Sequence, residues 1–102
     1  MEIIKADINN LTEAARLFDL YRQFYECPAD TELTTRFIKE RIENNESDIF
    51  LSIDGDSASG FLQLYPSFCS VQAIKIYILY DLYVEQEYRK RGIGESLSLI
   101  HI

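Results

Sequence analysis

Apolar positions in the first quarter of the chain recur at the spacing of one helical face. A short, loosely alternating stretch from Glu2 to Asp7 precedes them and predicts a first strand. Asn9 or Asn10 then offers a helix cap, and Pro28 ends the predicted helix, because proline lacks the N–H that a helix interior needs. The apolar face of this helix consists of Leu11, Ala14, Ala15, Phe18, Tyr21 and Tyr25.

A second helical pattern follows, and after it the spacing changes to that of strands. Asp30 or Thr31 can cap this second helix, whose apolar face carries Leu33, Phe37, Ile38 and Ile42. A polar turn then leads into Ile49-Phe-Leu-Ser-Ile53, which has the length and residue types of a strand. The order so far is strand, helix, helix, strand.

Two further strands are predicted, and the second is the longest apolar segment of the chain. Asp54-Gly-Asp-Ser predicts a hairpin whose loop can exceed two residues, and the strand after it covers Gly60 to Tyr65. Pro66 cannot donate a ladder hydrogen bond, so we expect it at a bulge or a strand end. From about Ala73 to Val84, large apolar residues occur in both alternating rows, with Tyr80 in one row and Asp81 in the other. This pattern favours a central strand covered on both faces, in an α/β fold.

Composition and charge narrow the function classes. The chain has 102 residues, enough for one domain, with 47% hydrophobic and 26% charged residues, as in an ordinary globular protein. Its net charge of -7 argues against nucleic acid as a partner, because such binding needs many cations. The absence of a long apolar run and of a signal-peptide layout predicts a soluble, cytoplasmic protein without a membrane partner.

Cysteine and histidine usage excludes several kinds of site. Cys27 and Cys69 lie far apart without CxxC spacing, which favours two reduced, partly buried thiols over a disulfide or a metal site. His101 is the only histidine, so the sequence predicts no metal centre and no histidine-activated nucleophile.

A basic loop containing glycines follows the long strand and contrasts with the acidic chain. Arg89, Lys90 and Arg91 are consecutive and precede Gly92 and Gly94, where a helix is expected to begin. A helix start presents unpaired N–H groups to an anion, and glycines let a pyrophosphate approach the main chain. Neither GxGxxG nor GxxxxGK[ST] is present. The loop therefore indicates a small phosphorylated ligand.

The loop and its context resemble the acetyl-CoA motif of the GCN5-related N-acetyltransferase (GNAT) superfamily. Arg89-x-x-Gly92-x-Gly94 is similar to its [QR]-x-x-G-x-[GA] signature and follows a strand that ends in Asp81-Leu-Tyr-Val84. With the order of the elements, the resemblance covers Ile3 to Ser96. It implies the GNAT-type acyl-CoA N-acyltransferase fold, a mixed, mainly antiparallel sheet flanked by helices.

The resemblance also implies a function and a cofactor site. Acetyl-CoA would donate its acetyl group to a primary amine of a small molecule or peptide, and a homodimer of the full-length form is one prediction. The alternative is a non-catalytic acyl-CoA-binding remnant or regulatory module. The backbone of the strand end would bind pantetheine, and the basic loop would bind pyrophosphate. The residues implied are Leu82, Tyr83, Val84, Arg89, Lys90, Arg91, Gly92, Ile93, Gly94 and Glu95.

The catalytic groups stay open at this point. Members similar to spermidine/spermine and thialysine acetyltransferases carry a glutamate where this chain has Tyr80. Either Asp81 or a water-linked acid acts as the base, or the amine arrives already neutral. For Asp81, the favoured alternative is a structural role as a hydrogen-bond acceptor at a distortion of the strand. The aromatic stripe Tyr21, Phe24 and Tyr25 could approach the acceptor, although such a stripe more often belongs to the core.

The end of the chain departs from the family pattern. After Gly94 the family continues with further helices and strands, so we expect residues 1–96 to be a partial domain, truncated after the pyrophosphate loop and inactive by itself. The segment Leu97-Ser-Leu-Ile-His-Ile102 back-translates into a sequence that resembles a transposon-end adaptor. We therefore expect residues 97–102 to be a non-native tail, the alternative being a coincidental apolar helix segment.

Overall fold

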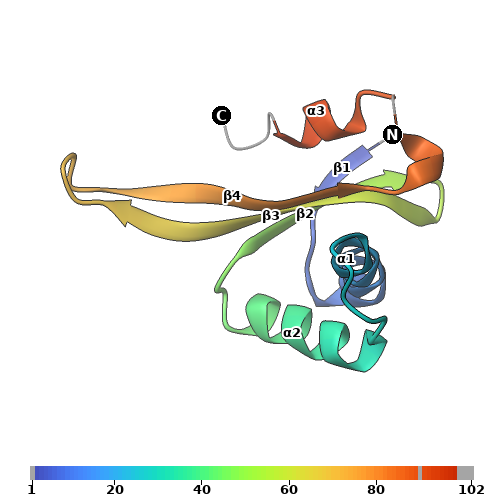
Figure 1. Cartoon of the computed structure of the whole chain (residues 1–102). Helices are drawn as coiled ribbons and strands as arrows, with labels where there is room; N and C mark the ends of the chain where they lie inside the picture. Colours follow the sequence, from blue (N-terminus) through green and yellow to red (C-terminus); the bar gives the residue numbers. More distant parts are fainter. Residues whose placement is uncertain (1, 90, 99–102) are drawn as a thin grey trace.

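The structure is a computed structural model that describes residues 2–89 and 91–98 (Figure 1). Two helices follow the first strand, three strands come next, and a short helix follows the last strand, as the sequence predicts. The elements are β1 (Glu2–Lys5), a 3-10 turn (Ile8–Asn10), α1 (Leu11–Phe24), α2 (Thr31–Glu43), β2 (Asp48–Asp54), β3 (Ser57–Cys69), β4 (Ile74–Val84), a second 3-10 turn (Gln86–Tyr88) and α3 (Ile93–Ser98).

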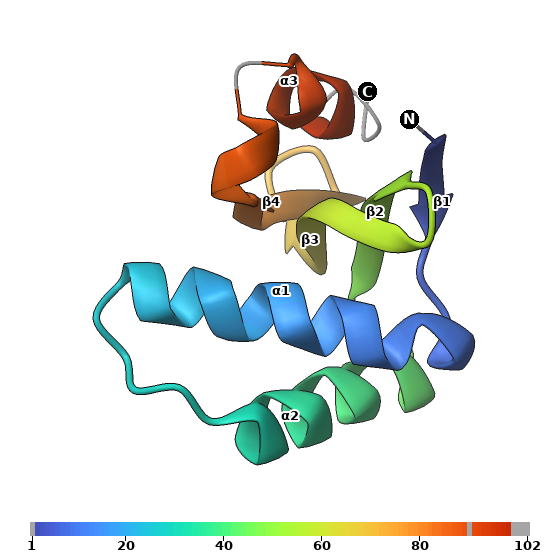
Figure 2. The same cartoon turned by 90° about the vertical axis from the view of Figure 1, so that its right-hand side faces the viewer.

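The strands form one sheet with helices on both faces. The sheet has the order β1-β2-β3-β4, and every neighbouring pair in the described part of the chain is antiparallel. Figures 1 and 2 show α1 and α2 on one face of the sheet and α3 on the other. The expected α/β fold with a mainly antiparallel sheet is confirmed, although no parallel pair occurs among the described strands.

Aspartates cap the 3-10 turn before α1 and the start of α2. Asp7 accepts a hydrogen bond from the backbone N–H of Asn9 at 2.9 Å, while Oδ1 of Asn10 accepts one from the N–H of Asp7 at 3.0 Å. This reciprocal box starts the 3-10 turn that leads into α1, so neither Asn9 nor Asn10 caps α1 with its side chain, contrary to expectation. Asp30 caps α2 as predicted, accepting from the N–H of Leu33 at 3.1 Å.

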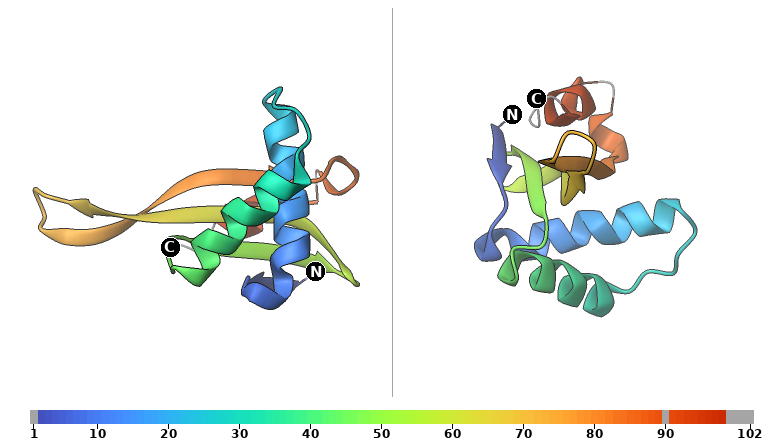
Figure 3. Two further views of the ribbon diagram at one scale, coloured as in Figure 1. Left: turned by 90° about the horizontal axis from the view of Figure 1, so that it is seen from below. Right: turned by 90° about the vertical axis from the view of Figure 1, so that its left-hand side faces the viewer.

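The two hairpins differ from expectation in opposite ways. Between β2 and β3 the turn is tight: Asp54 pairs with Ser57, and Gly55 has a φ of 67°. In contrast, β3 extends beyond Tyr65, and Pro66 lies inside it, paired with Tyr77. Pro66 is tolerated there because β2 pairs with β3 only as far as Leu64, so this stretch of β3 has a neighbour on one side alone. The β3–β4 hairpin consequently projects as an arm beyond the helices (Figure 3).

The prediction of a central strand covered on both faces is wrong for β4 in the described structure. β4 lies at the edge of the sheet, with β3 as its one described neighbour. Its large side chains are exposed by 37% to 66% at Ile74, Tyr77, Ile78, Tyr80 and Leu82. Apolar residues in both rows mean that both faces of a strand can be covered, but they do not show that they are covered. In this structure α1 and α3 reach only the C-terminal part of β4.

Two apolar clusters hold the layers together, one on each face of the sheet. The larger joins α1 and α2 to the sheet and includes Leu17, Ile38, Ile49, Leu51 and Phe61. The smaller joins α3 to the sheet and consists of Leu62, Leu64, Ile93 and Leu97. Within the described ranges, no helix is long and apolar enough to cross a bilayer.

Candidate active site

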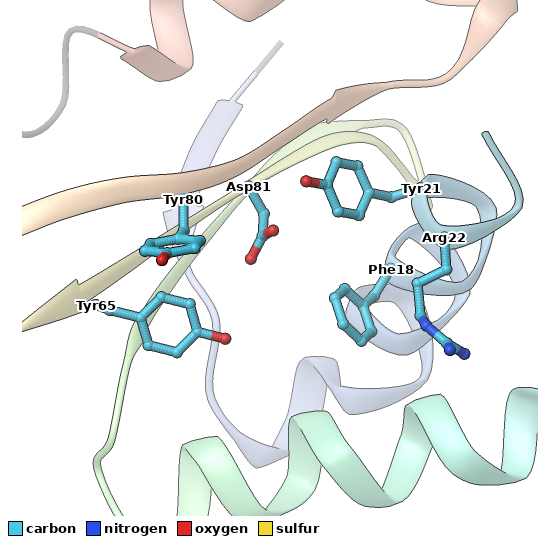
Figure 4. Close-up of a pocket in the computed structure, with 6 residues that line it drawn as sticks. All are labelled: Phe18, Tyr21, Arg22, Tyr65, Tyr80 and Asp81. Atoms are coloured by element: carbon cyan, nitrogen blue, oxygen red, sulfur yellow. The ribbon is translucent and has the colours of Figure 1, made fainter. Parts of the chain in front are cut away.

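A β-bulge in β4 creates the pocket at the centre of the molecule. Gln63 pairs with Asp81 and Leu64 with Leu79, so Tyr80 is the extra residue of β4. At the bulge the strict alternation of side chains is lost. Figure 4 shows the side chains of Tyr80 and Asp81 on the same side of β4, the side on which α1 and α2 lie. The open pocket beneath them has a volume of about 460 Å³ and is lined by Phe18, Tyr21, Arg22, Tyr65, Tyr80 and Asp81.

The Asp81 carboxylate is held in place from the sheet. Nε2 of Gln63 donates a hydrogen bond of 2.8 Å to Oδ2 of Asp81, and Oγ of Ser47 donates one of 2.8 Å to Oε1 of Gln63. All three side chains are buried. A buried carboxylate needs such donors because burial without them is costly. Asp81 is thus an acceptor beside a strand distortion, and its role as a base stays a prediction.

Two tyrosines face Asp81 as neutral phenols. Burial raises the pKa of Tyr21 well above its ordinary range, and the neighbouring Asp81 carboxylate adds to that rise. Burial and then the charge of Asp81 also raise the pKa of Tyr65. The Tyr65 ring meets the Tyr80 ring edge to face, at 5.4 Å between centroids. The pocket wall therefore combines one carboxylate with several aromatic faces.

The aromatic stripe of α1 lies only partly in the core. Tyr21 is half-buried and packs edge to face on Phe61, at 5.7 Å between centroids. Phe24 and Tyr25 are 63% and 64% exposed, so the core interpretation is wrong for them. A second pocket, of about 170 Å³, is lined by Tyr21, Phe24, Tyr25, Leu82, Tyr83, Val84 and Arg89. Tyr21 is common to both pockets, which places the end of β4 beside the pocket of Asp81.

The basic loop turns the chain from β4 into α3. Gly92 has a φ of 75°, a left-handed conformation that favours glycine, and α3 starts at the next residue. Nε of Arg89 donates a hydrogen bond of 2.9 Å to the carbonyl of Val84, and its guanidinium lies 5.5 Å from the Tyr83 ring centroid. The Arg91 guanidinium lies 5.2 Å from the Tyr88 ring centroid. Lys90 is outside the described residues.

The start of α3 packs against the sheet at Gly60. Ile93 is buried, and a Cβ at Gly60 would lie 3.3 Å from its Cγ2 and 3.1 Å from the carbonyl oxygen of Tyr83. A Cβ at Gly94 would meet Val84 at an ordinary 3.8 Å. Glu95 is exposed on the first turn of α3. The absence of a Cβ at Gly60 therefore lets α3 approach the end of β4.

Sequence reasoning missed several residues of this site. Gln63 carries a signal that could have been read, because it is a polar residue within the apolar run Phe61 to Leu64. Arg22, Phe18 and Tyr65 carry no local signal, since the fold alone brings α1 and β3 to the bulge. In the part of the chain that the structure describes, no group of three or more His, Cys, Asp or Glu side chains could hold a metal ion.

Comparison with known proteins places these features in a family. The model of the acetyltransferase (GNAT) family matches residues 14–98. YhfO of Bacillus subtilis (strain 168), an uncharacterized N-acetyltransferase, is 40% identical over 97 residues, which are 95% of this chain and 65% of the relative. A probable acetyltransferase of Haemophilus influenzae (strain ATCC 51907 / DSM 11121 / KW20 / Rd) is 32% identical over 98 residues, 95% of this chain and 67% of the relative.

A solved structure agrees with the sequence relatives. The crystal structure of a probable acetyltransferase superimposes with a TM-score of 0.90 at 35% identity, covering 97% of this chain and 67% of that one. The chain thus spans about two thirds of the length of these relatives. The matches to the family model, to the relatives and to this fold agree: the chain belongs to the GNAT family of acetyltransferases.

Proposed function

We propose that the protein transfers the acetyl group of acetyl-CoA to a primary amine of a small molecule or peptide. The observation that carries this proposal is that Tyr21 forms a wall common to two neighbouring pockets. On one side of it lies the pocket along Leu82, Tyr83 and Val84, and on the other lies the pocket of Asp81. An acyl carrier along the strand end and an amine beside Asp81 would meet at this wall.

The chain offers a site for acetyl-CoA at the end of β4. Among the described strands, β4 has no neighbour on its outer side, so its backbone groups can pair with the amides of pantetheine. The left-handed turn at Gly92 and the start of α3 supply N–H groups for a pyrophosphate, and Arg91 adds charge. The proposed cofactor-binding residues are Leu82, Tyr83, Val84, Arg89, Lys90, Arg91, Gly92, Ile93, Gly94 and Glu95.

Acetyl-CoA would supply a thioester, whose C–S bond breaks as the amine nitrogen forms the new C–N bond; CoA would leave as its thiolate and become the free thiol by taking up a proton. The amine must lose a proton on the way. Asp81 is the proposed acceptor of that proton, directly or through water, because it is the acidic side chain in the lining of the pocket. Gln63 engages Oδ2 of Asp81 and orients the carboxylate. Tyr80, beside Asp81 on the bulge, is the second candidate for the catalytic group. An amine that arrives neutral would need neither residue as a base.

Acetyl-CoA and a small amine are the two partners that this function requires. A homodimer, a cytoplasmic location, inactivity of residues 1–96 by themselves and an adaptor-derived origin of residues 97–102 stay predictions. Of that last segment, Leu97 is buried in the smaller core cluster, whereas residues 99–102, His101 among them, lie outside the described residues.

Two glycines provide a matched test of the cofactor site. Gly92 and Gly55 both have a left-handed φ, of 75° and 67°, and a Cβ would meet nothing within 4 Å at either position. Valine at either site imposes similar backbone strain, but only Gly92 lies in the proposed cradle. We expect Gly92→Val to weaken acetyl-CoA binding, measured by calorimetry, by at least about tenfold, and Gly55→Val to leave it unchanged.

Activity is measured on the full-length form as free CoA thiol released in the presence of an amine panel, because residues 1–96 are predicted to be inactive by themselves. Thiol release that depends on the amine supports the transferase. Binding of acetyl-CoA without turnover on any amine supports the non-catalytic module instead. Equal affinities of the two glycine variants for acetyl-CoA would refute the assignment of the cradle.

A further inference from the structure

Arg22 lies in the wall of the pocket of Asp81, the acceptor pocket, where the amine is proposed to bind. Among the described residues, its guanidinium has no hydrogen-bond or ion-pair partner. Its Nη1 is buried, and among the residues that the structure describes it is the one buried side-chain nitrogen or oxygen with no hydrogen-bond partner. No described ion pair includes Arg22, whereas Arg16 pairs with Glu13 and Glu85. A buried guanidinium donor without an acceptor is costly, so its position calls for an oxygen that the described residues do not provide.

The position of Arg22 connects the acceptor pocket to a groove between α1 and α2. Arg22 and Phe18 line the pocket of Asp81, and both also line a cavity of about 220 Å³ with Leu33, Thr34 and Phe37. In Figure 4 the guanidinium lies beyond the Phe18 ring from Asp81 and points toward α2. A carboxylate and a guanidinium thus lie on opposite sides of Phe18, and Phe18 and Arg22 line both cavities.

We propose that the acceptor is a small primary amine that also carries a carboxylate, that is, an amino acid in the broad sense. This inference rests on the proposed acetyl transfer and names the acceptor class of the same pocket. The ammonium end lies at Asp81, where the faces of Tyr65 and Tyr80 also favour a cation. The carbon skeleton passes over Phe18, and the carboxylate pairs with Arg22, whose planar guanidinium matches two carboxylate oxygens.

The same arrangement rejects amines with a second positive charge. A diamine with one ammonium at Asp81 would bring its other ammonium toward the Arg22 guanidinium, and like charges repel in a partly desolvated site. An amine that ends in a methyl group would leave Arg22 unpaired. Selectivity therefore follows the order amino acid, monoamine, diamine, although the chain as a whole carries a charge of -7 that would attract diamines.

A matched set of acceptors tests this order. We compare 4-aminobutanoate, butylamine and 1,4-diaminobutane, and then amino acids of shorter and longer skeleton, each with its methyl-ended counterpart. Binding to residues 1–102 is measured by calorimetry without acetyl-CoA, and kcat and KM are measured on the full-length form by release of CoA thiol. We expect the best amino acid to bind at least about tenfold more tightly than its methyl-ended counterpart.

Substitutions separate the role of Arg22 from a general effect of charge. Arg22→Met removes the guanidinium with little change in volume, and Arg22→Lys keeps the charge. Arg36→Met on the exposed face of α2 makes the same change in net charge away from the pocket. We expect Arg22→Met to raise KM for the amino acid by at least about tenfold, with the methyl-ended amine unchanged, Arg22→Lys to restore part of the loss and Arg36→Met to have no effect.

The outcomes distinguish this inference from the proposed function. Amine-dependent thiol release with equal use of amino acids and methyl-ended amines would overturn the inference and keep the transferase. An equal loss for both acceptor types in Arg22→Met, with a folded protein by circular dichroism, would also overturn it. If the full-length form acetylates no amine, the proposed function fails, and the binding titrations still decide whether Arg22 recognises a carboxylate.

Discussion

Gln63 and Asp81 form a buried hydrogen-bonded pair across β3 and β4, with 2.8 Å between Nε2 and Oδ2. Ser47 completes the arrangement by donating to the other end of the Gln63 amide. The pair lies next to the bulge at Tyr80, so it holds the carboxylate where the strand departs from regular pairing. Local stability and the geometry of the proposed site are therefore coupled.

The first prediction concerns this pair. Gln63→Met should lower the free energy of unfolding by about 1–3 kcal/mol, because the Asp81 carboxylate and the Ser47 hydroxyl lose their buried partners. Urea denaturation measures the effect. Gln23→Met is the matched control: its amide also donates to an aspartate, Asp19 at 2.8 Å, but the Gln23 side chain is exposed.

A double-mutant cycle shows whether the pair itself is responsible. Gln63→Met and Asp81→Asn, made singly and together, should be non-additive by at least about 0.5 kcal/mol. Additive effects would mean that each residue acts through other neighbours.

The second prediction concerns the seat of α3. Gly60→Ala should destabilise the protein by about 1–3 kcal/mol, because the added Cβ overpacks the site. It would lie 3.1 Å from the Tyr83 carbonyl oxygen, which is backbone and cannot rotate away. Gly94→Ala is the control, since its Cβ would lie 3.8 Å from Val84 and alanine favours the helix. Equal thermal stability of the two variants would contradict the close approach of α3.

The third prediction concerns acid. The hydrogen bond from Arg16 lowers the pKa of Glu13 from 4.5 to about 2, with help from the backbone of Ala58 and the hydroxyl of Ser57 and against the effect of burial. Because the folded pKa is the lower one, the contribution of Glu13 to stability is complete above pH 4.5 and is lost as the pH falls toward 2.

Substitution of Glu13 measures how much this carboxylate contributes to the loss of stability in acid. Glu13→Gln should flatten the fall in the free energy of unfolding over that range, by no more than about 1 kcal/mol because solvent screens the partly exposed pair. Urea denaturation at several acidic pH values measures the slope. An unchanged slope in Glu13→Gln would show that other carboxylates govern the acid response.

The fourth prediction concerns alkali. Burial and the neighbouring Asp81 raise the pKa of Tyr21 above its ordinary value of 10.0. An acidic group with a raised folded pKa stabilises the fold below its unfolded pKa, and this contribution is lost as the pH rises. The free energy of unfolding should therefore decline above pH 10.0, and Tyr21→Phe should reduce that decline. Asp81→Asn, which keeps the phenol of Tyr21 and removes the neighbouring charge, should reduce the decline in part. An unchanged decline in Tyr21→Phe would refute the effect of Asp81 and burial on Tyr21.

Local signals were sufficient for the order of the elements, and they also led to the proposed cradle. Helical spacing, the cap at Asp30 and the apolar strands each depend on residues close in sequence, and they predicted the fold class correctly. The basic loop was also predictable, since Gly92 and Gly94 with Arg89 form a contiguous motif. Confirmation of the family supports that interpretation, although the contacts of the loop with acetyl-CoA stay a proposal.

The acceptor pocket could not be predicted in the same way. Strict alternation placed Tyr80 and Asp81 on opposite faces. Only the mismatch between β3 and β4 places an extra residue at Tyr80 and puts both side chains on the side of the sheet where α1 and α2 lie. Register depends on pairing between strands, which a pattern along one strand does not record.

The sequence by itself thus determined the helices, the strands and the glycine loop, because spacing, capping and turn chemistry act over a few residues. Tertiary structure alone decided that β4 is an edge strand in the described sheet, that Gln63 supports Asp81, and that Nη1 of Arg22, in the wall of the acceptor pocket, has no hydrogen-bond partner among the described residues. These relationships depend on which distant elements pack together, and the free energy that selects that packing is distributed over the whole core.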